Sequence, residues 1–584
     1  MRSACAIGWA TLLAGVCAGC AGRGEGARIL AEDDLPRFVS DPPGAVQAAA
    51  VEGEKFGRGL RIMASSGGAV SAQATVNAPI QAGDVLLLRF HLRSREDREA
   101  RIEARFEPEI SRWSSALRMA ARSGPAWKIY EYPFSARRDY APGESRVEFR
   151  VRGGEPSVEI GGVELRNYGQ RGTKDGLPCT RLDYAGSEPG AAWRQAAAER
   201  IERIRKGDLV VSVHDAAGAP VPDVEVNVRM KRHAFGFGSV VNVALLTGQR
   251  DQLAAADLER YRKVCLRLFS KAVVVGALKW PQWEQPGTPE RVSQVVDWLT
   301  ENRIPLRGHV LVWPSWRWLP ARLKELEKDP PALRAAVREH IREEASALRG
   351  KVCEWDVINE PYSNHDLMDI LGKDVMVEWF QDARRADPDV KLYLNDYGIL
   401  TPDGDAHRRH FEETIAFLID RGAPLDGIGM QGHFGSEVTP PEEMLAVLDR
   451  FSRFGKDIQV TEFDVDTIDE ELQADFTRDL LTVCFSHPAV KGLLMWGFWE
   501  GRHWKPNGAM MRPDWSAKPN LRAYEDLVLN EWWTRARGAA DSQGCFRVRG
   551  FLGDYEVEVK YGDEVSRAEV TLGPDGAAVR LKLE

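Results

Sequence analysis

The chain has 584 residues, which is too long for one compact domain and predicts three or four domains of roughly 100–200 residues each. The net charge is −9, so the chain has no excess of positive charge to attract nucleic acid, and we expect no nucleic-acid partner. The cysteines after residue 20 are odd in number, far apart and without C-x-x-C spacing, so we predict neither a zinc site nor a disulfide framework, and we expect no metal and no cofactor. They are Cys179, Cys265, Cys353, Cys484 and Cys545.

Residues 1–20 read as an export signal. Arg2 precedes a short apolar run, and small residues follow around Cys20. The ending "CAGC" resembles a bacterial lipobox, which implies lipidation of Cys20, although Cys17 stands where such motifs usually carry leucine. We therefore expect an exported protein held to a membrane by a lipid anchor, as an outer-membrane or cell-surface lipoprotein of a bacterium. Cleavage without lipidation, giving a periplasmic or secreted protein, is the alternative.

Residues 27–168 alternate apolar and polar side chains in short stretches separated by Gly, Pro and charged turns. Examples are "VLLLRFHLR" from Val85 and "VEFRVR" from Val147, and this pattern predicts a β-sandwich. The length and patterning resemble the jelly-roll carbohydrate-binding modules often attached to secreted glycosidases. Trp113 and Trp127 could stack on sugar, but a tryptophan in a small sandwich more often belongs to the core.

Residues 169–207 are predicted to hold a linker and one helix, whose apolar face carries Trp193, Ala197, Ile201 and Ile204. In residues 208–231, apolar and polar side chains alternate on both sides of a Gly/Pro turn, and this pattern predicts a β-hairpin. A hairpin alone is marginal in water. Because residues 541–584 show the same alternation, we expect both segments to form one small accessory β domain.

Residues 232–535 alternate short apolar strands with helical stretches, which predicts a parallel sheet. About 300 residues suit an eight-stranded (β/α)8 TIM barrel, so the fold class is α/β. Eight candidate strands follow in order: "FGFGSVVN", "AVVVGALKW", "PLRGHVLVW", "CEWDVINE", "KLYLNDY", "GIGMQGH", "IQVTEFDV" and "GLLMWGFW".

Two of these strands close on an acid, Glu360 in "WDVINE" and Glu462 in "VTEFDV". Active sites of such barrels lie at the carboxyl ends of the strands, so both acids are expected in the site. Two carboxyl groups across a sugar-sized cleft can break a glycosidic bond, one as acid and the other as nucleophile. Either acid alone is better explained as a rim salt bridge.

The barrel region resembles glycoside hydrolase family 10, the endo-1,4-β-xylanase family, in "GHVLVW", "WDVINE", "LNDY", "GIGMQGH", "TEFD" and "MWGFWEGRHW". The resemblance implies Glu360 as general acid/base and Glu462 as nucleophile, working with retention through a covalent glycosyl-enzyme. It implies that Asn359 binds the sugar 2-hydroxyl, and that His433 and Asp464 hold Glu462 ionised and oriented. The implied pocket residues for the sugar undergoing cleavage are Lys279, His309, Trp313, Asn359, Gln431, His433, Trp496 and Trp504.

The chain departs from that family at one sugar subsite. Pro314 replaces the usual second histidine, while Val275 and Gly276 replace a Glu-Asn pair that grips the next sugar. These changes predict a less polar subsite with a weaker hold on unsubstituted xylose. Trp316 and Trp318 could offset the loss, although Trp318 could equally anchor its loop.

We therefore expect a hydrolase that cleaves β-1,4-xylosidic bonds in xylan or a related plant polysaccharide by double displacement. A retaining β-glycanase acting on a decorated or different glycan is one alternative. A lipid-anchored glycan-binding protein without turnover is another, and product release from xylan separates the two classes.

Overall fold

The computed structural model describes residues 26–31, 38–51, 54–63, 67–106, 115–174, 176–248, 254–402 and 404–583. The export signal with Cys20, and also Trp113, lie outside these residues, so the expectations attached to them stay predictions. The chain divides into two compact units, with the sequence boundary between Thr180 and Arg181. Within the described ranges, none of the helices combines the length and apolar composition that a membrane crossing needs.

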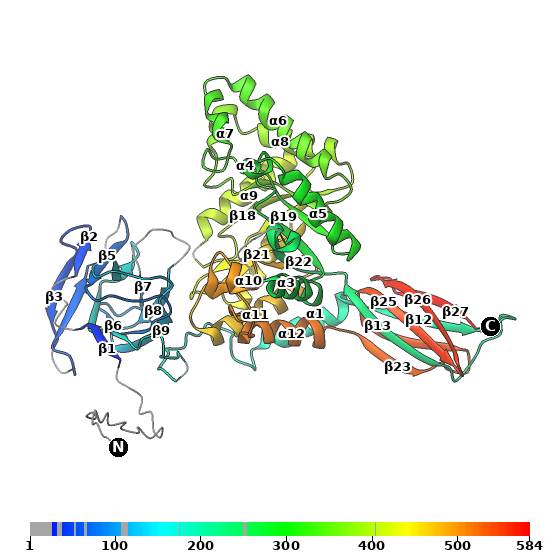
Figure 1. Cartoon of the computed structure of the whole chain (residues 1–584), viewed down its shortest axis with the longest axis horizontal. Helices are drawn as coiled ribbons and strands as arrows, with labels where there is room; N and C mark the ends of the chain where they lie inside the picture. Colours follow the sequence, from blue (N-terminus) through cyan, green and yellow to red (C-terminus); the bar gives the residue numbers. More distant parts are fainter. Residues whose placement is uncertain are drawn as a thin grey trace, which may run out of the picture. The chain divides into compact units, whose positions relative to one another are not determined.

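The first unit is a two-sheet β-sandwich in which every strand pairing is antiparallel. One sheet has the order β3-β4-β11-β6-β9 with β1 beside β11, and the other has the order β2-β5-β10-β7-β8 (Figure 1). The strands are β1 (Ala27–Leu30), β2 (Val39–Asp41), β3 (Val46–Ala50), β4 (Arg58–Ile62), β5 (Val70–Val76), β6 (Val85–Ser94), β7 (Ala100–Phe106), β8 (Leu117–Ser123), β9 (Lys128–Ser135), β10 (Ser145–Val151) and β11 (Val158–Asn167).

Aromatic rings fill the space between these two sheets. Phe90 of one sheet meets Phe149 of the other edge to face, with ring centroids 4.9 Å apart, and Phe106 lies 5.0 Å from Phe134. Trp127 is half-buried at the margin, where the guanidinium of Arg93 covers its ring at 4.6 Å. Carbohydrate binding by this unit stays a prediction.

The second unit begins with helix α1 (Ala192–Ile204), which buries Trp193, Ala197 and Ile201 as the periodicity predicts. Ile204, the fourth residue of the predicted face, is only half-buried, because it is the last residue of the helix. A small β-sandwich follows, built from sheets β24-β12-β27 and β23-β13-β25-β26. Its strands are β12 (Lys206–His214), β13 (Glu225–His233), β23 (Arg535–Ala539), β24 (Cys545–Phe551), β25 (Gly553–Tyr561), β26 (Glu564–Leu572) and β27 (Ala577–Lys582).

The predicted hairpin of residues 208–231 is wrong, because β12 and β13 lie in different sheets and pair with carboxy-terminal strands instead. The turn itself forms, since the Val221 N–H donates to the Val213 carbonyl at 3.0 Å. Pro220 and Pro222 then supply no N–H for a continuing ladder. The carboxy-terminal part also starts earlier than expected, with β23.

The central region of the second unit is a closed barrel whose described residues form eight parallel strands, as predicted (Figure 1). The sixth strand consists of two pieces, and pairing of β19 with β21 closes the ring. The strands are β14 (Gly236–Asn242), β15 (Lys271–Val275), β16 (Leu306–Val312), β17 (Glu354–Asn359), β18 (Lys391–Asp396), β19 (Gly427–Met430), β20 (His433–Phe434), β21 (Asp457–Val465) and β22 (Val490–Met495).

Helices surround the barrel and bury their apolar faces against it, as amphipathic helices of a β/α fold do. The α-helices are α2 (Val243–Thr247), α3 (Ala255–Leu268), α4 (Trp280–Trp283), α5 (Thr288–Glu301), α6 (Pro330–Ala347), α7 (Asp366–Leu371), α8 (Val375–Ala386), α9 (Asp405–Asp420), α10 (Pro441–Ser452), α11 (Glu470–Ser486) and α12 (Pro519–Glu525). Shorter turns are η2 (Ala321–Leu326), η3 (Glu500–Arg502), η4 (Pro506–Gly508) and the π-helical η5 (Asp526–Glu531).

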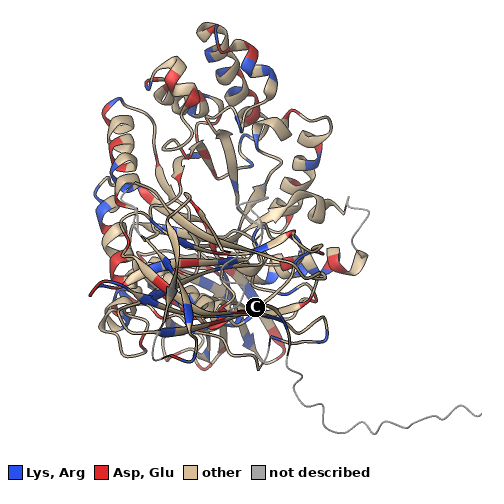
Figure 2. Ribbon diagram, turned by 90° about the vertical axis from the view of Figure 1, so that its left-hand side faces the viewer, with Lys and Arg blue, Asp and Glu red and all other residues tan. Residues whose placement is uncertain are grey.

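Basic and acidic residues are interspersed along these helices (Figure 2). Many of them form ion pairs between neighbouring helices. Arg338 of α6 pairs with Asp382 of α8 at 2.7 Å, and Arg450 of α10 pairs with Glu412 of α9. Such a mixed surface suits the modest net charge of the chain.

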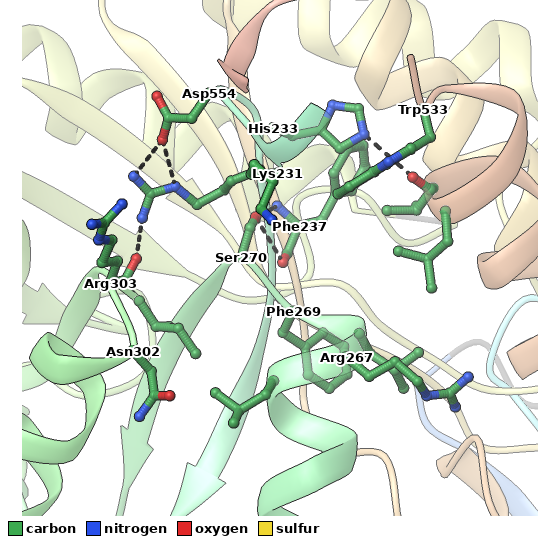
Figure 3. A pocket seen from close by; sticks show the side chains of 16 residues that line it. Lys231, His233, Phe237, Arg267, Phe269, Ser270, Asn302, Arg303, Trp533 and Asp554 are labelled. Atoms are coloured by element: carbon green, nitrogen blue, oxygen red, sulfur yellow. Dashed lines mark hydrogen bonds and ion pairs between the residues drawn. The ribbon is translucent and has the colours of Figure 1, made fainter. Parts of the chain in front are cut away.

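A cavity of about 240 Å³ lies where strand β13 meets the barrel (Figure 3). Arg232 spans this junction, because its guanidinium contacts Asp554 at 2.6 Å and also donates to the Arg303 carbonyl. His233 is buried beside it, 3.3 Å from the Val528 carbonyl, and burial lowers its pKa to about 4. These contacts connect the small sandwich to the barrel wall.

Candidate active site

Glu360 directly follows β17, and its backbone is held in the left-handed region with φ of 54°. Its N–H donates to the Asn395 carbonyl at 2.8 Å. The carboxyl group accepts one hydrogen bond at Oε1 from Gln431 Nε2 at 2.9 Å and another at Oε2 from Asn364 Nδ2 at 3.2 Å. A non-glycine residue in this conformation is uncommon, and the strain is frequently found at functional sites.

The pKa of Glu360 is raised to about 7, chiefly because burial disfavours its charged form. The hydrogen bond from Gln431 acts in the opposite direction, while the charges of Glu462 and Asp396 raise the pKa further. Glu360 therefore keeps its proton up to about neutral pH, as a general acid must.

Glu462 is buried in β21 and lies three residues before the strand ends, not at its end as predicted. The strand continues because Asp464 and Val465 pair with β20. Glu462 Oε1 accepts from Asn395 Nδ2 at 2.9 Å, and Oε2 lies 3.0 Å from His433 Nε2. Burial raises the pKa of Glu462, but the hydrogen bond from His433 and the charge of His309 outweigh it, so the pKa lies below its usual value.

His433 connects Glu462 to a second acid, since its Nδ1 lies 3.1 Å from Asp464 Oδ2. Asp464 is buried and also accepts a hydrogen bond from Trp504 Nε1 at 2.7 Å. Burial is the largest influence on the pKa of His433 and lowers it, but the negative charge of Asp464 and the hydrogen bonds to Asp464 and Glu462 together outweigh burial and raise the pKa. The histidine thus favours the protonated form, which donates to both carboxylates and keeps Glu462 ionised.

Buried amides join the two glutamates. Asn359 Oδ1 accepts from Asn395 Nδ2 at 2.9 Å and from Gln431 Nε2 at 3.4 Å, and these same amides donate to Glu462 and Glu360 respectively. Asn359 Nδ2 is buried and has no hydrogen-bond partner among the described residues, so it is available to a bound ligand.

Sequence reasoning missed Asn395 and Asn364 as members of the site. Asn395 lies in "LNDY", one of the motifs that carry the family resemblance, and its place near the end of β18 was a usable signal. Asn364 follows Glu360 by four residues in a turn, and the sequence gives no indication of its contact.

Cations and aromatic rings near the two acids line the barrel rim. The Lys279 ammonium lies 4.7 Å from the Trp313 ring, and burial lowers its pKa. The His309 ring lies 5.4 Å from Trp496, and its Nδ1 is 2.9 Å from Asp356. The predicted site residues therefore gather at one end of the barrel, with flat apolar faces suited to pyranose rings.

The structure shows the surroundings of the residues that differ from the family pattern at the neighbouring sugar subsite. Trp318 stacks on Trp313 with centroids 4.0 Å apart, so it extends that aromatic surface. Trp316 lies in the same loop under the Lys324 ammonium at 4.4 Å. Gly276 has φ of 81° and borders open space, since a Cβ at this position would meet none of the described atoms within 4 Å. Pro314 uses its carbonyl to accept the Leu367 N–H.

Comparisons with known proteins identify the family that the barrel region resembles. The family model described as "Glycosyl hydrolase family 10" matches residues 231–525. Anti-sigma-I factor RsgI6 of Acetivibrio thermocellus is 32% identical over 375 residues, covering 63% of this chain and 47% of that protein. Endo-1,4-beta-xylanase 1 of Arabidopsis thaliana is 29% identical over 365 residues, covering 62% and 37%. The chain thus spans half or less of the length of these curated relatives.

Among solved structures, xylanase 10B from Thermotoga petrophila RKU-1, crystallised with xylobiose, matches with a TM-score of 0.46 and 25% identity. That match covers 51% of this chain and 95% of the crystallised chain.

Proposed function

The chain belongs to glycosyl hydrolase family 10, and on this premise we propose that it hydrolyses β-1,4-xylosidic bonds in xylan or a related plant polysaccharide with retention of configuration. One observation carries the proposal. Glu360 and Glu462 lie at the same end of the barrel, joined through buried amides, and their environments shift their pKa values in opposite directions. Such a pair supplies a proton donor and a charged nucleophile at the same pH.

In the first step, the Glu462 carboxylate attacks the anomeric carbon while Glu360 transfers its proton to the departing glycosidic oxygen. A covalent glycosyl-enzyme forms and the aglycone leaves with that proton. In the second step, Glu360, now a carboxylate, takes a proton from water as the water attacks the anomeric carbon. The bond to Glu462 breaks, and both glutamates return to their starting states.

The surrounding residues support these steps. Asn359 Nδ2 is free to donate to the sugar 2-hydroxyl, a contact that strengthens as charge develops at the anomeric carbon. His433 and Asp464 keep Glu462 ionised and oriented. Lys279, Trp313 and the other rim residues bind the sugar ring. Because both catalytic acids are retained, turnover is favoured over the alternative of a glycan-binding protein without activity.

The pH dependence of kcat/KM should report both acids. Activity is expected to fall above about pH 7, where Glu360 loses its proton, and to persist below the usual glutamate range, where Glu462 stays charged. Because the Gln431 hydrogen bond lowers the pKa of Glu360, Gln431→Leu should move the alkaline limb to higher pH. A pH–rate profile of wild type and variant on one xylo-oligosaccharide checks this, and a limb that stays in place would contradict the assigned contact.

We also propose that the mature protein is exported and anchored through Cys20. Cys20→Ala should move the protein from the membrane fraction to the soluble fraction when cells are lysed and centrifuged. Cys179→Ala, a substitution at an exposed thiol elsewhere in the chain, is the matched control and should leave the distribution unchanged. If the Cys20 variant stays with the membrane, lipidation at this residue is wrong.

A further inference from the structure

A small cavity opens beside the sugar-binding rim, between the ends of β14 and β22. Its volume is about 70 Å³, and it is lined mainly by aromatic residues together with Asn242 and Arg502. Trp496 and Trp504 form one wall, and these rings also face His433 at 6.1 and 4.7 Å. Since one water needs roughly 10–15 Å³, the cavity has room for a small chemical group. It lies directly beside the proposed catalytic pocket, because the two share Trp496 and Trp504.

Arg502 is the cationic group in this lining. Its side chain is exposed, and Nη1 donates only to the Gly501 carbonyl, at 3.0 Å; within the described part of the chain it forms no ion pair. Other barrel arginines, such as Arg338 and Arg450, pair with acids. An arginine fork presents several donors in one plane and matches a carboxylate bidentately.

The turn that carries Arg502 is firmly placed. Trp499 at its start stacks on Trp515 with centroids 4.4 Å apart and an interplanar angle of 9°. Glu500 pairs with Lys518 at 3.0 Å, and its N–H donates to the Met511 carbonyl at 2.9 Å. The guanidinium therefore starts from a fixed backbone position, which lowers the entropic cost of binding a ligand.

We propose that this cavity binds the carboxylate of a uronic acid substituent on the glycan, with Arg502 as the specificity-determining contact. The inference rests on the proposed function, because it places an acidic side group next to the sugar undergoing cleavage. It also accounts for Pro314 and Gly276, which stand where the family usually carries polar residues that bind sugar. A substrate held through its acidic substituent depends less on hydrogen bonds from main-chain hydroxyls to the enzyme.

The experiment compares kcat/KM on three xylo-oligosaccharides of equal length: unsubstituted, carrying one glucuronic acid on the non-reducing side of the cleaved bond, and carrying the methyl ester of that acid. Wild type should prefer the acid over its ester about ten- to hundredfold, the range of a charge-assisted hydrogen-bonded pair. Arg502→Ala should abolish this preference and leave cleavage of the unsubstituted substrate within about threefold. Arg502→Lys should keep part of the preference for the acid, because lysine retains the positive charge but lacks the planar guanidinium donors.

Arg317→Ala is the matched control. Arg317 is exposed, covers the Trp318 ring at 4.6 Å and does not line the cavity, so its removal changes the net charge equally. It should preserve the preference of acid over ester. The proposal is overturned if wild type treats acid and ester alike, if Arg502→Ala slows all three substrates equally, or if Arg317→Ala abolishes the preference as fully. Failure of the proposed function would look different, since wild type would then release product from none of the three.

Discussion

Glu462→Ala is expected to lower kcat on a xylo-oligosaccharide by about four to six orders of magnitude, because the variant has no group to form the glycosyl-enzyme. The buried carboxylate accepts hydrogen bonds from Asn395 and His433, and the barrel around it is formed by many other contacts. The fold should therefore survive with a modest change in Tm. Steady-state kinetics and a thermal melt on the same preparation measure both effects.

Glu339→Ala is a useful comparison, because this exposed acid on α6 lies outside the site. It should retain wild-type kcat within about twofold, as surface substitutions usually do. If Glu462→Ala kept more than about a hundredth of wild-type activity while folded, the nucleophile would have to be another residue.

Glu360→Ala should lose nearly all activity on xylan but respond to azide on an activated aryl xyloside. The aryl group leaves without a proton, so Glu462 can still form the glycosyl-enzyme, which then accumulates because no base activates water. Azide needs no base and should raise turnover by about two orders of magnitude or more. The expected product is the β-glycosyl azide, detected by NMR.

Azide also distinguishes the proposed roles of the two glutamates, because the two variants should form glycosyl azides of opposite configuration. In Glu462→Ala, azide can only occupy the space of the missing nucleophile and attack the substrate directly, which gives the α-glycosyl azide. An α product from Glu360→Ala, or no response to azide in that variant, would contradict the assigned roles.

The barrel was predictable because each strand is a short, nearly continuous apolar run that ends in polar or aromatic residues. "AVVVGALKW" and "GLLMWGFW" show the pattern, and β15 and β22 form there. The two proposed catalytic acids were found by the same logic, since rim positions of a barrel display their side chains to the site.

The small sandwich was only partly predictable. Alternation correctly indicated strands at β12 and β13, but strand pairing depends on partners more than 300 residues away. The Gly/Pro turn favoured a local hairpin, and nothing local shows that the two strands diverge after it. The short strand β23 has exposed or half-buried residues only, and its sequence has too little apolar pattern to be recognised.

Contacts between side chains of different strands were also beyond sequence reasoning. The amide connection from Gln431 through Asn359 to Asn395 involves β17, β18 and the loop after β19, so it exists only once the barrel closes. The place of Arg502 beside Trp496 depends in the same way on the fold of the loop after β22.

The most direct test of the central proposal is a ¹H NMR time course of xylo-oligosaccharide hydrolysis by the purified protein, recorded faster than the product mutarotates. Cleavage through a Glu462 glycosyl-enzyme predicts that the newly formed reducing end appears first as the β anomer, with the α anomer growing in later by mutarotation. Initial release of the α anomer, or no product from any β-1,4-linked xylo-oligosaccharide, would contradict it.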